Sequence, residues 1–114
     1  MRVIIAGSRN INDKDLVYSA IKESKFNIDE IVSGNCRGVD IIGEQYAKDN
    51  NIVLTIFKAD WQKFGKAAGI IRNNVMIDYA NALIAIWDEK SRGPKHIITQ
   101  AKNNRLKVFI KLIF

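Results

Sequence analysis

The sequence predicts an α/β fold: one three-layer domain in which helices cover both faces of a five-stranded parallel sheet. Three observations carry this prediction. Short apolar runs alternate with stretches of helical periodicity, and this alternation is typical of a parallel sheet. The chain has 114 residues, a common length for one domain. It has a single proline and no linker-like segment, so residues 1–114 are predicted to form one domain.

The predicted strands are short apolar runs, most of them rich in valine and isoleucine, as buried parallel strands usually are. They are Val3–Ala6, Glu30–Ser33, Val53–Phe57, Ala82–Ile86 and Lys107–Leu112. Because crossovers between parallel strands are right-handed, we expect the strand order 3-2-1-4-5. The switch point then lies between the first and fourth strands, and ligands of such sheets bind there, at the carboxyl ends of the strands.

Four helices are predicted between the strands. Asn12 is placed to cap the first helix. The second follows the helical template from Val39 to Ala47, and the third covers about Ala68–Ala80. Pro94 is expected to open the fourth, because proline favours the first helical position. We expect Asn104 to end that helix in the left-handed conformation.

Composition restricts the classes of partner. The net charge is +6, from 18 Lys and Arg against 12 Asp and Glu, which favours an anionic partner. No apolar run approaches the roughly 20 residues of a membrane span, and the N-terminal segment is too short for a signal peptide. Cys36 has no cysteine to pair with, as is common in reducing compartments. We therefore expect a cytoplasmic protein with no membrane partner.

Glycines, arginines and both tryptophans gather in the loops that follow the predicted strands. Gly7-Ser8-Arg9 follows the first strand, and Gly34 and Gly38 flank Arg37 before the second helix. Small residues let backbone amides approach a phosphate, and a helix N-terminus attracts anions. Asp40, in the first turn of that helix, is either a ribose or base contact or an acid that complements the helix dipole.

Two further segments belong to the same predicted edge. Residues 60–69 are predicted to be a long irregular loop, in which Asp60 precedes Trp61. Trp61 either stacks on a base or anchors the loop to the core. Arg72 and Asn73 begin the next helix, where Arg72 is a candidate phosphate ligand or a surface residue.

The fourth strand ends in Trp87-Asp88, and Ser91, Gly93 and Lys95 surround the start of the last helix. A cation in a first turn opposes the helix dipole, and a bound anion would relieve this conflict. No group of histidine, cysteine and acidic residues has the spacing of metal ligands, so we expect no metal site.

Four motifs recur together in one family: Gly-Ser-Arg at 7–9, Gly-x-x-x-Gly-x-Asp at 34–40, the segment 59–73, and Trp-Asp-x-x-Ser-x-Gly at 87–93. With them, nearly the whole chain resembles the YspA-like (YpsA-related) branch of the SLOG superfamily. The resemblance implies a Rossmann-like fold and a nucleotide or nucleotide-derived ligand, with homo-oligomers as a further expectation. The superfamily also includes cytokinin-activating phosphoribohydrolases and a DNA-processing protein.

The chain departs from the superfamily pattern at two positions. Pro94 stands where the family usually has a phosphate-binding threonine, which puts phosphate binding at the last helix in doubt. Ile97 stands where phosphoribohydrolases carry a glutamate, while their arginine matches Arg72. The resemblance therefore implies a ligand class more firmly than a reaction, and it identifies no catalytic residue.

These observations favour a module that binds a nucleotide or a nucleotide-derived small molecule as sensor, carrier or sequestering protein, with no cofactor required. In this interpretation the phosphate is held by Gly7, Ser8, Arg9, Gly34, Arg37, Gly38 and Arg72. Asp40 or Asp88 contacts the ribose, and Trp61 or Trp87 flanks the base. Two alternatives are open: a nucleotide-processing hydrolase with Asp88 or Asp60 as acid or base, and a single-stranded DNA binder.

Overall fold

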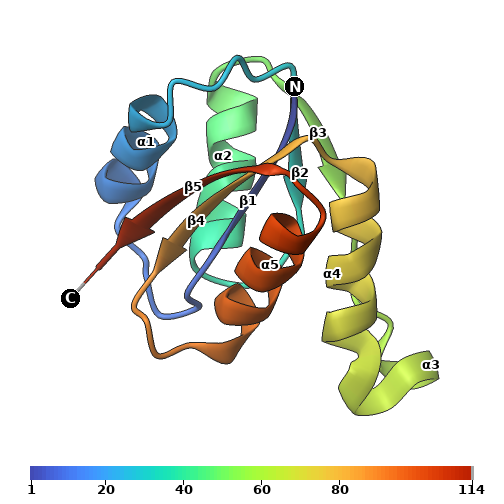
Figure 1. Cartoon of the computed structure of the whole chain (residues 1–114). Coiled ribbons are helices and arrows are strands. Elements are labelled where there is room, and N and C mark those ends of the chain that lie inside the picture. Colours follow the sequence, from blue (N-terminus) through green and yellow to red (C-terminus); the bar gives the residue numbers. More distant parts are fainter. Residues whose placement is uncertain (114) are drawn as a thin grey trace.

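The structure, a computed structural model, describes residues 1–113 and has the predicted β-α alternation (Figure 1). The strands are β1 (Arg2–Gly7), β2 (Glu30–Ser33), β3 (Val53–Ile56), β4 (Ala82–Trp87) and β5 (Lys107–Leu112). The helices are α1 (Lys14–Glu23), α2 (Val39–Asp49), α3 (Trp61–Phe64), α4 (Ala68–Tyr79) and α5 (Arg92–Asn103), with a 3₁₀ turn η1 (Gly65–Ala67) between α3 and α4.

The five strands form one parallel sheet in the order β3-β2-β1-β4-β5, which confirms the predicted order. The central strand β1 pairs with β2 on one side and with β4 on the other. The order reverses between β1 and β4, which confirms the predicted position of the switch point.

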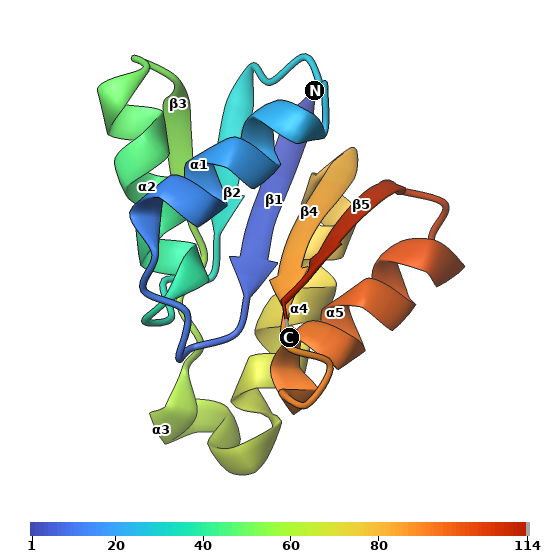
Figure 2. The ribbon, with the colours of Figure 1, turned by 90° about the vertical axis from the view of Figure 1, so that its left-hand side faces the viewer.

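Helices cover both faces of this sheet (Figure 2). On one face, α1 and α2 pack on side chains that include Val3, Ile5 and Ile84. On the other face, α4 and α5 pack on Ile4 and Leu83. Neighbouring residues of one strand face opposite layers because the side-chain period of a strand is two. Both layers are apolar and fully buried, which explains why the central strands lack polar alternation.

Gly43 brings α2 close to the sheet. A Cβ atom at this position would lie 2.7 Å from the Cγ2 atom of Ile5, so any larger residue would push the helix away from β1. Helix α2 therefore delivers its N-terminus directly to the carboxyl end of β1, where the candidate site lies.

Two helices begin at residues other than those predicted. Helix α1 begins at Lys14 and is capped by Asp13, whose Oδ1 accepts a hydrogen bond from the Leu16 amide at 3.1 Å, so Asn12 is one residue too early. Helix α5 begins at Arg92, which makes Pro94 its third residue. Proline fits anywhere in a first turn because the amides there have no partner within the helix.

The left-handed stop after α5 is Arg105, with φ 61°, and not Asn104, with φ −100°. The Asn104 side chain instead bonds back to the last turn, with its Nδ2 2.8 Å from the Gln100 carbonyl oxygen. The remaining ends shift by one or two residues: β1 includes Arg2 and Gly7, β4 includes Trp87, β3 ends at Ile56 before Phe57, α4 ends at Tyr79 before Ala80, and α2 continues past Ala47 to Asp49.

The segment predicted as an irregular loop is helical. Asp60 caps α3 by accepting a hydrogen bond from the Lys63 amide at 3.1 Å, and Gly65 ends it with φ 56°. An acidic N-cap and a glycine with positive φ are local helix signals, and they decide the conformation here. In Figure 1, α3 projects from the N-terminal end of α4, at the carboxyl ends of the strands.

Candidate functional site

Two cavities open at the carboxyl ends of the strands, a region that we call the carboxyl edge. The first has a volume of about 370 Å³ and lies between the end of β1 and the start of α5. We call it the α5 cavity. Its lining is Ala6, Gly7, Arg9, Asn10, Cys36, Arg37, Asp40, Arg72, Asn73, Met76, Ser91, Arg92, Gly93, Pro94 and Ile97.

The second cavity, about 550 Å³, lies next to the first and reaches toward α3, so we call it the α3 cavity. It is lined by Arg9, Gly34, Asn35, Cys36, Arg37, Lys58, Ala59, Trp61 and Arg72.

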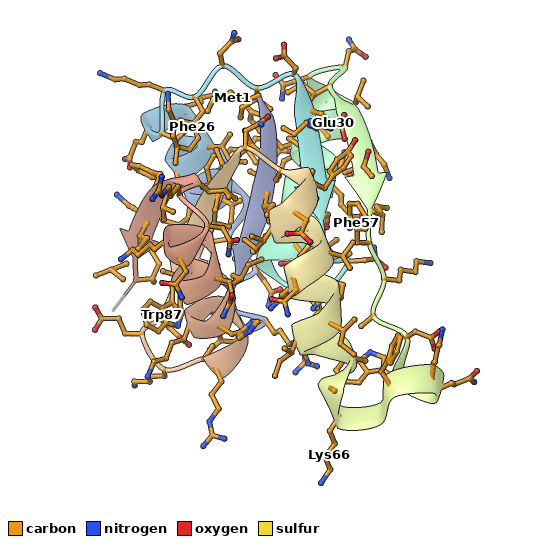
Figure 3. The ribbon with its side chains drawn as sticks, turned by 45° about the vertical axis from the view of Figure 1, so that its right-hand side comes forward. Met1, Phe26, Glu30, Phe57, Lys66 and Trp87 are labelled. Carbon is orange, nitrogen blue, oxygen red and sulfur yellow. The ribbon has the colours of Figure 1, made fainter. Side chains whose placement is uncertain are left out.

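Figure 3 shows which end of the molecule carries the cavities. The carboxyl edge is the end where Lys66, beyond α3, and Trp87, at the end of β4, are labelled, and Met1 and Glu30 are labelled at the opposite end.

Close backbone contacts hold together the loops beside the α5 cavity. A Cβ atom on Gly7 would lie 2.2 Å from the Ile86 carbonyl oxygen, and a Cβ atom on Gly38 would lie 2.6 Å from the Ser8 carbonyl oxygen. Gly38 also has φ 82°, which other residues adopt only with strain. The two glycines therefore let the loops after β1 and β2 touch, and this contact places Arg9 beside Arg37.

A buried acid holds the loop between β2 and α2. Glu44 is 7% exposed, and its Oε2 accepts hydrogen bonds from Ser33 Oγ at 2.7 Å and Asn35 Nδ2 at 2.8 Å. Asn35 adopts φ 61°, a conformation that asparagine tolerates better than most residues. Glu44 thus fixes the turn that presents Cys36 and Arg37 to both cavities.

Arg72 is tied to the protein on two sides. Its Nη1 donates to the Gly34 carbonyl oxygen at 2.6 Å, and its Nε donates to Asn73 Oδ1 at 3.0 Å. Asn73 Nδ2 lies 3.2 Å from Nδ1 of His96, so the chain of contacts continues from α4 to α5. Arg72 therefore fixes the loop after β2 as well as adding positive charge to the site.

Arg9 and Arg37 are exposed, in contrast to Arg72. Arg9 makes only a weak contact with the Cys36 sulfur, at 3.8 Å, and Arg72 approaches the same sulfur at 3.7 Å. Within residues 1–113, no ion pair includes Arg9, Arg37 or Arg72. Three guanidinium groups thus stand together without a carboxylate bound to any of them.

Asp40 is buried behind these arginines and lines the α5 cavity. Burial raises its pKa to about 6, although the Cys36 amide, 3.3 Å away, and the nearby Arg72 charge oppose the rise. With this pKa, the Asp40 carboxyl group changes charge around pH 6, at the wall of a cavity. Both functions expected for Asp40, a ligand contact and a structural acid, are consistent with this position.

The Asp88 carboxylate accepts hydrogen bonds from the loop that follows it. Its Oδ1 accepts hydrogen bonds from the amides of Ser91, at 2.8 Å, and Lys90, at 2.9 Å, and its Oδ2 accepts from the Ser91 hydroxyl. These hydrogen bonds lower the pKa of Asp88 to about 2. Trp87 also turns to this loop, with its Nε1 2.8 Å from the Ser91 carbonyl oxygen. Neither side chain lines the α5 cavity or the α3 cavity.

The start of α5 faces the α5 cavity without a side-chain cap. Ser91 is the N-cap residue, but its hydroxyl group is committed to Asp88 and makes no bond to the helix. The lining includes Arg92 and Gly93, whose amides belong to the first turn, while Pro94 has no amide hydrogen to offer. Lys95 is exposed and lines neither cavity.

The structure brings most of the predicted site residues to the two cavities. The α5 cavity includes Gly7, Arg9, Arg37, Asp40, Arg72, Asn73, Ser91 and Gly93, and the α3 cavity adds Gly34 and Trp61. Ser8 lies behind the wall, where its Oγ accepts from the Asp88 amide. The predicted residues that line neither cavity are Ser8, Gly38, Asp60, Trp87, Asp88 and Lys95.

Sequence reasoning missed the apolar wall of the α5 cavity and one cation of the α3 cavity. Met76 and Ile97 were not predicted to contact a ligand, although both line the α5 cavity. Ile97 lies in the second turn of α5, which starts at the carboxyl edge, and this position was an available signal. Met76 lies in the C-terminal half of α4 and carried no such signal. Lys58, directly after β3, lines the α3 cavity, and its place after a strand was a signal of the same kind.

Two further properties concern membranes and metals. Over the part of the chain that the structure describes, no helix is long and apolar enough to cross a bilayer. The same residues contain no group of three or more histidine, cysteine and acidic side chains arranged to hold a metal ion.

A family model described as the YspA, cpYpsA-related SLOG family matches residues 1–64. This match runs from β1 to the end of α3 and includes the loops that carry Arg9 and Arg37. The Gene 61 protein of Mycobacterium phage D29 is 31% identical over 111 residues, covering 89% of this chain and 88% of the phage protein. No solved structure matches the chain.

Proposed function

The chain belongs to the YspA, cpYpsA-related SLOG family, and on that premise we propose that it binds a nucleotide or a nucleotide-derived small molecule at the carboxyl edge. The observation that carries the proposal is the cluster of Arg9, Arg37 and Arg72, which line both cavities. Guanidinium groups suit phosphate because they donate paired hydrogen bonds and keep their charge.

The position of the cluster supports the same proposal. The α5 cavity lies at the switch point between β1 and β4, where ligands of open α/β sheets bind. The uncapped first turn of α5 adds the positive end of a helix dipole. Its apolar wall, which includes Met76 and Ile97, suits the face of a base.

The structure gives less support to a hydrolase. The superfamily position of the phosphoribohydrolase glutamate is Ile97, which is 2% exposed and lines the α5 cavity with an apolar side chain. Asp88 is engaged by its own loop, and its pKa of about 2 does not suit a general acid at neutral pH.

A single-stranded DNA binder is also less well supported. Such a protein needs a continuous basic groove. Here Lys22 and Lys48 lie in the last turns of α1 and α2, and Lys107 begins β5, so these cations are at the opposite end of the sheet from the cavities. The basic charge at the carboxyl edge is a local cluster, which suits a small anion.

The test is a thermal-shift screen of mono-, di- and triphosphates and cyclic nucleotides of the four bases. A ligand at 100 times its dissociation constant adds about 2.7 kcal/mol of stability, which raises the melting temperature of a small domain by on the order of 10 °C. Arg37→Ala should abolish the shift without changing the unliganded melt, because the Arg37 side chain is exposed and makes no ion pair within residues 1–113.

Lys22→Ala is the matched control, since it removes one exposed positive charge from α1. It should leave the shift intact. A screen in which no compound raises the melting temperature contradicts the proposal, as does an Arg37→Ala protein that retains the full shift.

A further inference from the structure

The two cavities share one boundary, and its composition is unusual. Four residues line both cavities: Arg9, Cys36, Arg37 and Arg72. Three of the four are arginines, while Arg92 in the α5 cavity and Lys58 in the α3 cavity add one cation each. Most of the positive charge that lines the two cavities therefore lies between them. We call these four residues the junction.

The cavities on either side of the junction differ in chemistry. Beyond the junction, the α5 cavity has an apolar wall that includes Met76 and Ile97, together with the polar side chains of Asp40 and Asn73. The α3 cavity contains Trp61, whose side chain is half exposed, and Lys58. Each cavity therefore offers an apolar or aromatic surface, and each is large enough for a small organic group.

This arrangement distinguishes between ligands by where their charge lies. A mononucleotide carries its phosphate at one end, so a phosphate at the junction would leave one cavity without a ligand group. A molecule with a diphosphate bridge carries its charge in the middle and has an uncharged group at each end. The second kind of molecule is the better match to a site that has most of its cations in the middle and a cavity on each side.

Resting on the nucleotide-binding function proposed above, we propose that the ligand is a nucleoside diphosphate linked to a second polar group, such as a sugar. The nucleoside lies in the α5 cavity, where Asn73 and Asp40 provide hydrogen-bonding groups beside the apolar wall. The diphosphate lies against Arg9, Arg37 and Arg72, and the second group lies against Trp61, since aromatic faces suit sugar rings and bases alike.

The experiment is a ladder of matched ligands measured by calorimetric titration. For each base it compares the nucleoside monophosphate, the diphosphate and the diphosphate sugar: AMP, ADP and ADP-ribose; UMP, UDP and UDP-glucose; GMP, GDP and GDP-mannose; CMP, CDP and CDP-glucose. In one ladder, affinity should rise at least tenfold from monophosphate to diphosphate, and at least tenfold again with the sugar.

Trp61→Ala should remove the gain that the sugar provides and leave the affinity for the nucleoside diphosphate unchanged. Phe64→Ala is the matched control, because Phe64 is also an exposed aromatic residue of α3 but lines neither cavity. This variant should keep the full gain.

Equal affinities along every ladder that shows binding would overturn this inference and leave nucleotide binding intact. A sugar gain that survives Trp61→Ala, or a short single-stranded oligonucleotide that binds more tightly than every diphosphate sugar, would also overturn it. The absence of binding by every nucleotide would overturn both proposals.

Discussion

The two ends of the parallel sheet carry polar residues of the same kinds but use them in opposite ways. At the amino ends of the strands, Glu30 accepts hydrogen bonds from the Thr55 and Tyr79 hydroxyl groups, and Arg2 stacks over the Tyr79 ring at 4.5 Å. At the carboxyl edge, Arg9 and Arg37 face the cavities, and no carboxylate of residues 1–113 forms an ion pair with either of them.

This comparison distinguishes two roles of polar residues: some stabilise the fold, and others are available to a ligand. A polar group whose partners lie within the chain contributes to folding, whereas neighbouring unpaired cations repel one another until an anion binds. Arg72 belongs to both classes, since it anchors the Gly34 carbonyl group and also lines the junction.

The largest effect is expected where the carboxyl edge depends on close backbone packing. Gly7→Ala places a Cβ atom 2.2 Å from the Ile86 carbonyl oxygen, and the β1–β4 pairing must shift to accommodate it. We expect a loss of about 3 kcal/mol or more in the free energy of unfolding, measured by denaturant titration. Gly93→Ala is the control, because a Cβ atom there meets nothing within 4 Å. Equal stability of the two variants would contradict this account.

The second prediction concerns the buried acid of the carboxyl edge. The pKa of Asp40 is raised from 3.8 to about 6, so the native state binds this proton more tightly than the unfolded state does. Stability is therefore lost as the pH rises from about 4 to 6, by on the order of 2–3 kcal/mol. The free energy of unfolding of Asp40→Asn should lack this loss when both proteins are measured at pH 4 and pH 7.

Asp78→Asn, on the exposed face of α4, is the matched control for that comparison. It should follow the wild-type pH profile. An Asp40→Asn protein with the wild-type profile would show that the Asp40 carboxyl group is not the source of the loss.

The third prediction separates two arginines of the same edge. Arg72→Lys keeps the charge but loses the planar group that reaches Gly34 and Asn73, so we expect a loss of about 2 kcal/mol in unfolding free energy. Arg37→Lys should change stability by less than about 0.5 kcal/mol, because the side chain is exposed. Similar losses in both variants would remove the distinction between anchoring and ligand-facing arginines.

The smallest effect is expected at the amino ends of the strands. Tyr79→Phe removes one hydroxyl group from Glu30, which keeps its bond to Thr55, so we expect a loss of about 1 kcal/mol in unfolding free energy. Nucleotide affinity, measured by calorimetry, should be unchanged. A Tyr79→Phe protein with weakened nucleotide binding would show that the two ends of the sheet are coupled.

Most of the fold could be predicted because hydrophobic periodicity and alternation are local properties of the chain. The helical segment from Asp60 to Gly65 was missed because its length suggested a functional loop, although an acidic cap and a glycine were both present. The error at Pro94 has a similar origin, since a preference for the first helical position does not exclude the third.

The site was harder to predict than the fold because polar side chains satisfy one another through contacts that sequence does not display. Trp87 ends β4 and Asp88 follows it, where ligand residues often lie, yet both side chains bond to the loop that leads to α5. Aspartate often accepts hydrogen bonds from the backbone amides two and three residues further on, and it thereby stabilises a turn. The presence of Asp88 in a short polar segment was therefore a turn signal that the sequence offered. Whether a side chain lines a cavity depends on packing between distant elements.

The pairing of β1 also affects how the protein folds while it is being synthesised. The strand is completed by residue 7, but its partner β4 spans Ala82–Trp87, so about three quarters of the chain must be synthesised before the centre of the sheet can close. Contacts so distant in sequence slow folding. A nascent chain carries one unpaired side of the apolar strand β1 throughout that interval, which exposes this strand to aggregation on the ribosome.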